Sequence, residues 1–220
     1  MSRIARIAVP LLAALALASC ASSPVDLKES RRVLGTENDV RVDAEVWGDK
    51  LSQSTTVTFK YDVTNQRPTA IAIAELLPSA TYDPDTQAVT IDVGSEVPGE
   101  QFLPRLVVVG PGEKRSFTAV AHVNILLPAN RATSPLTSYP KALQIKLNFL
   151  NDPAPFGMLV GIPERAVHNP TLAATLFPQW LERNEVVLTN TLPMRWGAED
   201  SPLPNAAGAG RRRGTGPPRP

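Results

Sequence analysis

The sequence predicts a mainly β protein, an antiparallel β-sandwich of about seven to nine short strands with one short C-terminal helix. Apolar and polar residues alternate with period two in several short runs, which is typical of strands buried on one face. Glycine, proline, asparagine and aspartate separate these runs, as turns require. Helical spacing of apolar residues is clear only near the C-terminal end.

Two strands at the start of the folded part, over residues 40–46 and 57–64, carry the clearest alternation. Charged or hydroxyl residues occupy the positions between the apolar ones. The apolar positions are Val40, Val42, Ala44, Val46, Val57, Phe59, Tyr61 and Val63. Before them, residues 27–34 fit either a short helical turn or a first edge strand.

The middle of the chain continues with short strands and turns. Ile71 and Ile73 indicate a third strand, which Leu76 could extend before Pro78. Residues 80–82 and 88–93 flank a turn rich in aspartate and predict a hairpin. A strand over 106–109 precedes the turn Gly110-Pro111-Gly112-Glu113, and the alternation over 117–125 predicts a hairpin across that turn. A further strand is expected over 143–149.

The C-terminal helix is predicted from its capping residues and its apolar face. Asn169 can cap the helix and Pro170 suits its first position. The face consists of Leu172, Ala173, Leu176, Phe177, Trp180 and Leu181. Pro178 predicts a kink or a restart. The face is expected to pack on the sandwich as a lid, with an exposed stripe for a partner as the alternative, and a closing strand follows over 185–191.

The N-terminal segment combines Arg3 and Arg6 with an apolar run too short for the roughly 20 residues of a membrane span. The run ends in Leu17-Ala18-Ser19-Cys20, which resembles the lipobox of bacterial lipoprotein precursors. The resemblance implies that residues 1–19 are a signal peptide and that Cys20 carries a diacylglyceryl group and an acylated amino terminus. An ordinary secretory signal with an incidental cysteine is the alternative.

The same resemblance implies a location. Lipoproteins of two-membrane bacteria that lack Asp after the cysteine tend to reach the outer membrane, and here Ala21 and Ser22 follow Cys20. The protein is therefore expected on the outer membrane, facing the periplasm, with surface display left open. The lipid on Cys20 is expected to attach the protein to this membrane.

Four regions follow from these patterns: a signal peptide over 1–19, a tether over 20–36, a β-sandwich domain with its helix and closing strand over 37–197, and a disordered Pro/Gly/Arg tail over 198–220. Four of the arginines lie in the tail, which leaves the body mildly acidic and argues against nucleic-acid binding. The tail either contacts an anionic envelope component or has no specific partner. No cysteine remains after Cys20 for an internal disulfide.

The strand Val57-Thr58-Phe59-Lys60-Tyr61-Asp62-Val63-Thr64-Asn65 and the 110–113 turn before Phe117 resemble the immunoglobulin-like modules of bacterial surface proteins. The resemblance covers roughly residues 37–150. It lacks the paired cysteines of antibody domains and identifies no single family. Such sandwiches host many functions, so the fold alone settles none.

Residues that could carry chemistry are few. His122 lies on the polar side of its strand and His168 in the loop before the helix, so neither predicts a metal site. Asp83 and Asp85 suggest a turn, because the glycine and glutamate of a calcium loop are missing. No nucleophile elbow or phosphate loop is present in the sequence. No catalytic, cofactor or metal residues are therefore assigned.

These observations predict a lipid-anchored envelope protein with a non-catalytic role in protein binding or assembly. A specific form of this hypothesis is an accessory subunit of a secretion or surface-appendage system, docking an envelope protein. The alternative is a hydrolase or carbohydrate-binding module that acts on the cell wall. That alternative requires convergent carboxylates or an aromatic groove, for which Trp47, Trp180 and Trp196 are candidates.

Overall fold

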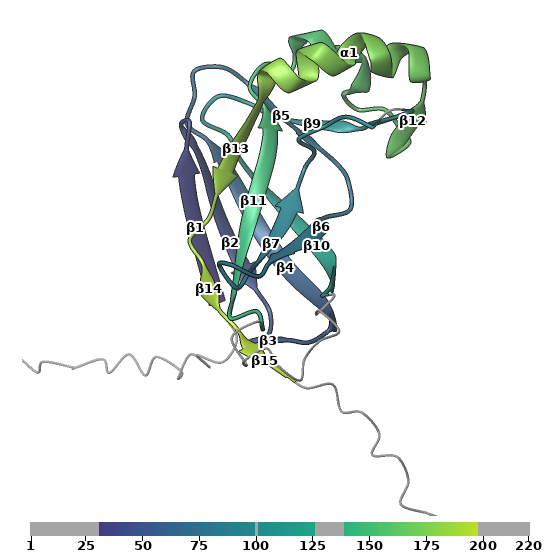
Figure 1. The fold of residues 1–220 in the computed structure, drawn as a ribbon. Helices are drawn as coiled ribbons and strands as arrows, with labels where there is room; N and C mark the ends of the chain where they lie inside the picture. The colour runs from purple at the N-terminus through teal and green to yellow at the C-terminus, as the bar shows by residue number, and fades with distance from the viewer. Residues whose placement is uncertain (1–30, 100, 126–138, 198–220) are drawn as a thin grey trace, which may run out of the picture.

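The computed structural model describes residues 31–99, 101–125 and 139–197, which form two packed β-sheets with a helix across one end (Figure 1). The signal segment, Cys20 and the 198–220 tail lie outside the described residues. The strands are β1 (Arg31–Glu37), β2 (Val40–Val46), β3 (Lys50–Leu51), β4 (Ser54–Asn65), β5 (Ile71–Ala74), β6 (Ser79–Asp83), β7 (Ala88–Val93), β8 (Phe102–Pro104), β9 (Leu106–Val109), β10 (Lys114–Asn124), β11 (Ala142–Leu150), β12 (Ala166–His168), β13 (Asn184–Leu188), β14 (Leu192–Pro193) and β15 (Arg195–Trp196). The helices are the 3-10 helix η2 (Ala154–Leu159) and α1 (Pro170–Arg183).

The mainly β class is confirmed, but the sheets are not antiparallel throughout. The first sheet has the order β1-β2-β4-β10, and the second has the order β6-β7-β11-β5-β9, with β13 and β14 also paired to β11. Strands β7 and β11 are parallel, with Ala88 opposite Ala142 and Val93 opposite Leu147. This pairing is available because a long crossover separates the two strands, so no tight hairpin fixes their direction. Small two-stranded sheets join β12 to β8 and β15 to β3.

The expected number of strands was too low. The described residues contain fifteen strands, and five of them (β3, β8, β12, β14 and β15) have only two or three residues. A strand that short shows no period-two pattern, so alternation cannot reveal it. The predicted hairpin across residues 110–113 is also wrong, because β9 pairs with β5 in the second sheet while β10 pairs with β4 in the first.

The N-terminal boundary of the folded part also differs from the prediction. Strand β1 begins at Arg31, inside the segment 20–36 assigned to a tether, and it pairs with β2 over its whole length. For the described part of residues 27–34, the structure therefore shows the first edge strand and not a helical turn. The side chain of Val33, a residue of β1, is fully buried, and this burial helps to hold the strand against the rest of the fold.

The main core lies between the two sheets and uses the alternating residues that the sequence predicted. Strand β4 buries every second residue against the inward faces of β7 and β11. The buried positions on these three strands are Val57, Phe59, Tyr61, Val63, Val89, Ile91, Val93, Leu143, Ile145, Leu147 and Phe149. The alternation at these positions is therefore the signature of one shared interior.

A second core lies under α1, which packs as the expected lid. Asn169 caps the helix by accepting a hydrogen bond from the backbone N–H of Leu172 at 3.0 Å. Trp180 is fully buried, and its indole N–H donates to the carbonyl of Ser95 at 3.0 Å. Of the two expectations at Pro178, a restart of the helix is wrong, because α1 is one continuous helix through it. Leu181 lies outside this core and is exposed.

One side of the molecule is closed by contacts between the two sheets. The backbone N–H of Leu34 donates to the Asn190 side chain at 2.6 Å, and the Asn190 N–H donates to the Leu34 carbonyl at 2.9 Å. At Gly35, an added Cβ would lie 2.5 Å from the Leu188 carbonyl oxygen, so only glycine allows this approach. Strands β1 and β13 therefore join the sheets along this side (Figure 1).

Replacing Phe59 by alanine tests the register of β4. Phe59 is fully buried, so Phe59→Ala should lower the free energy of unfolding by about 3–5 kcal/mol, measured by urea denaturation. The control is Lys60→Ala, because the next side chain on the strand is exposed and its loss should change the free energy by no more than about 0.5 kcal/mol. Equal effects of the two substitutions would contradict the register.

Candidate functional site

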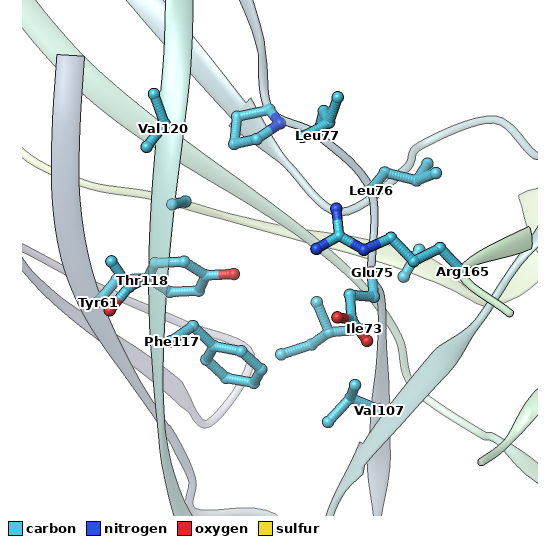
Figure 2. A pocket seen from close by; sticks show the side chains of 13 residues that line it. Tyr61, Ile73, Glu75, Leu76, Leu77, Val107, Phe117, Thr118, Val120 and Arg165 are labelled. Carbon is cyan, nitrogen blue, oxygen red and sulfur yellow. The ribbon is translucent and has the colours of Figure 1, made fainter. Parts of the chain in front are cut away.

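The side opposite β1 and β13 is open, and a cleft of about 420 Å³ lies there. One wall is β10, the edge strand of the first sheet, and the other is the 75–78 segment that connects β5 to β6. Val107 on β9 and Arg165 before β12 complete the walls. Figure 2 shows the lining side chains, and the Tyr61 hydroxyl and the Arg165 guanidinium point into the cleft from different walls.

Two stacked aromatic rings form the inner wall. Tyr61 on β4 and Phe117 on β10 lie directly opposite each other in the register, and their ring centroids are 5.0 Å apart. Burial raises the pKa of the Tyr61 hydroxyl, and the negative charge of Glu75 raises it further. The hydroxyl therefore stays protonated at neutral pH and can donate a hydrogen bond into the cleft.

Arg105 holds the outer wall in place. Its Nε and Nη2 atoms donate to Oε2 of Glu75 at 2.7 Å and 2.6 Å. The Arg105 backbone N–H donates to the Arg165 carbonyl at 2.7 Å, and its carbonyl accepts from the Glu75 N–H at 2.8 Å. One residue thus fixes the 75–78 segment and the loop that carries Arg165, and it neutralises the carboxylate of Glu75.

Arg165 gives the cleft a net positive charge. Its side chain is exposed, and among the described residues it makes no hydrogen bond or ion pair. Since Glu75 is already paired with Arg105, the charge on Arg165 is not balanced within the cleft. The arrangement favours a ligand that brings a negative group.

Apolar side chains surround this charged end and face solvent. Leu77 is 76% exposed, Leu76 is 42% exposed and Val120 is 40% exposed. All three line the cleft together with Phe117 and Ile73. Clustered exposed apolar residues of this kind mark an interaction site more often than isolated ones do.

The residues that the sequence analysis weighed for chemistry lie elsewhere. His122 is exposed on the outer face of β10, 3.3 Å from the Thr56 hydroxyl, as expected. His168 lies on β12 with its ring 4.9 Å from that of Phe102. Asp83 accepts hydrogen bonds from the Asp85 N–H and the Thr86 hydroxyl, which confirms the turn. The described part of the chain holds no cluster of side chains that could bind a metal.

The remaining candidates are separated or lie outside the described residues. Trp180 packs edge-on against Phe156 in the second core, while Trp196 packs against Tyr139 near β15, so these two tryptophans form no shared groove. Cys20 is not among the described residues. Neither of the helices in the described ranges is long and apolar enough to cross a membrane.

The cleft itself could not be found from the sequence. Tyr61 alternates as an ordinary core residue, Glu75 follows a strand, and Arg165 lies in a loop between proline-containing segments. These residues come from three separate segments, and no local spacing relates them. Leu76, which the sequence placed in an extension of the third strand, lies beyond β5 in the cleft wall.

No family model, curated protein or solved structure matches the chain. A function therefore has to be inferred from the cleft and from the sequence.

The buried hydroxyl of Tyr61 predicts a loss of stability in alkali. A raised folded-state pKa stabilises the fold below the ordinary tyrosine value of 10.0, and this contribution is lost as pH rises towards the folded value. The free energy of unfolding should therefore fall less steeply in Tyr61→Phe than in the wild type, measured by urea denaturation about one pH unit below and above the ordinary value. Tyr82→Phe is the control and should change the slope less, because that ring is only half-buried. Identical slopes in the wild type and Tyr61→Phe would contradict the assignment.

Proposed function

We propose that this chain is a lipid-anchored cell-envelope protein whose folded part binds a partner protein and performs no catalysis. The observation that carries the proposal is the cleft between β10 and the 75–78 segment, with its exposed apolar residues and its unbalanced arginine. A role as an accessory subunit of a secretion or surface-appendage system is the specific form of this proposal.

The contrast between the two sides of the molecule supports protein binding. On one side, the Leu34 backbone exchanges hydrogen bonds with the side chain and the backbone N–H of Asn190 and closes the space between the sheets. On the other side, Leu77 and Val120 remain in contact with solvent, although a soluble domain gains free energy by covering such surface. A partner that covers these side chains would supply the missing burial.

The anchor is supported by the sequence alone. The motif Leu17-Ala18-Ser19-Cys20 and the residues Ala21 and Ser22 favour lipidation of Cys20 and attachment to the outer membrane, facing the periplasm. Several acyl chains on one cysteine would hold the protein stably, because each buried methylene contributes about 0.8 kcal/mol. The cleft would then meet its partner close to the membrane surface.

The cleft provides little support for an enzyme that acts on the cell wall. Glycoside hydrolysis commonly needs two carboxyl groups on opposite sides of the scissile bond. Among the described residues that line the cleft, Glu75 is the only one with a carboxylate, and this carboxylate forms an ion pair with Arg105. The non-catalytic proposal is preferred for this reason.

We also propose that the fold is an immunoglobulin-like sandwich. Two sheets with one shared core and an exposed edge strand support it. The parallel pair β7–β11 and the helical lid depart from an all-antiparallel arrangement, and the proposal therefore describes a variant of that architecture.

The anchor and the partner are tested in one series of experiments. Mass spectrometry of the membrane fraction should find lipid on Cys20, and Cys20→Ala should be released into the soluble fraction. A photo-reactive amino acid at Leu77 should then crosslink a defined envelope protein in cells. The control is the same group at Leu34, which is 46% exposed on the closed side and should give no such product.

Two results would contradict the proposal. An unmodified, soluble wild-type protein would contradict the proposed membrane anchor. Equal crosslinking from Leu77 and Leu34, or turnover of cell-wall fragments by the purified protein, would remove the specific non-catalytic partner.

A further inference from the structure

We propose that the cleft binds an extended acidic segment of its partner, which adds as a strand to the free edge of β10 and places a carboxylate against Arg165. This inference rests on the protein-binding role proposed above. It adds the conformation and the chemistry of the bound segment, which that role leaves open.

The free edge follows from the register of β10. Asn65 N–H donates to the Glu113 carbonyl and Ile125 N–H donates to the Gln53 carbonyl, so the odd-numbered residues of this segment direct their backbone groups towards β4. The even-numbered residues Thr118 and Val120 therefore direct their N–H and C=O groups away from the sheet. Both residues line the cleft.

No strand of the described residues occupies this edge. Strand β10 pairs with β4 alone, and β6, although it lies near β10, pairs with β7. An unpaired edge of eleven residues is a template for strand addition, in which main-chain hydrogen bonds supply affinity and pockets read alternate side chains. A small anion would use the arginine but not the row of backbone groups, so the edge favours a polypeptide.

The charge of the cleft selects an acidic segment. Arg165 makes no ion pair among the described residues, and the protonated hydroxyl of Tyr61 can donate a second hydrogen bond from a different wall (Figure 2). A carboxylate between them would accept from both, while Glu75 stays engaged by Arg105. A basic side chain at the same place would meet Arg165 with like charge.

The apolar walls select the neighbours of that acidic residue. In an added strand, residues two apart point to the same face, so the residues flanking the carboxylate at this spacing would face the cleft as well. Phe117 and Leu77 offer them apolar contacts. The preferred segment therefore alternates, with an acidic residue between two apolar ones on the face that enters the cleft.

A random nonapeptide library displayed on phage, selected on the full chain in detergent, tests this inference. The enriched sequences should share the acidic and apolar alternation. The enriched peptide should bind at least tenfold more weakly to Arg165→Ala. The control is Arg195→Ala, which removes an exposed arginine of β15 that pairs with Asp49 away from the cleft, and this variant should bind the peptide as the wild type does.

Strand addition is separated from general adhesion by a matched pair of variants. Thr118→Pro removes one outward N–H of an edge strand without touching the β4 ladder, and it should abolish binding, whereas Thr118→Ala keeps the N–H and should retain it. If Thr118→Pro fails to fold, N-methylation of the enriched peptide serves as the test in place of that variant. Methyl groups on alternate amides of the peptide should abolish binding in one frame and spare it in the other.

Absence of enrichment, equal binding to Thr118→Pro and Thr118→Ala, or insensitivity to both methylation frames would overturn the inference. If a protein still crosslinks to Leu77 after such a result, the partner binds by another surface chemistry and only the strand addition fails. If the crosslink is absent too, the protein-binding role fails with it.

Discussion

The corner held by Asn65 is the interaction on which both walls of the cleft depend. Asn65 ends β4, is fully buried, and accepts a hydrogen bond from the Arg67 N–H at 3.0 Å. Its amide nitrogen donates to the carbonyls of Thr69, Val109 and Gly110 at 2.8, 3.0 and 3.1 Å. A buried polar group left without its partner costs about 1–3 kcal/mol, so one side chain fixes where the chain enters β5 and leaves β9. The cleft lies between the strands that this corner directs.

The two sides of the molecule use the same backbone groups differently. Along β1, the first sheet meets the second through Leu34 and Asn190, and at Gly35 the backbone lies so close to that of Leu188 that no side chain fits between them. Along β10, the backbone groups of Thr118 and Val120 have no partner strand among the described residues, and Arg105 holds Glu75 at the start of the connection from β5 to β6. The open edge is therefore positioned by contacts elsewhere in the fold.

Local patterns in the sequence were enough to predict most strands, because period-two burial is a property of each strand alone. The alternation at Phe59 and the cap at Asn169 are of this kind. The pairing of strands is not local, which is why the parallel pair β7–β11 and the crossing from β9 to β10 were missed. The cleft was missed for the same reason, since Tyr61 and Arg165 meet only after both sheets and the β12 loop are in place.

The most direct test is residue-resolved amide hydrogen exchange of the full chain. It is measured for the protein alone and in complex with the partner that crosslinking from Leu77 identifies. In the free protein, the amides of Thr118 and Val120 should exchange faster than those of Ala119 and Ala121, which donate to β4. Binding of the partner should slow the first pair and leave the second pair nearly unchanged. Equal exchange of Thr118 and Val120 with and without the partner would contradict the claim that the free edge of β10 is the binding surface.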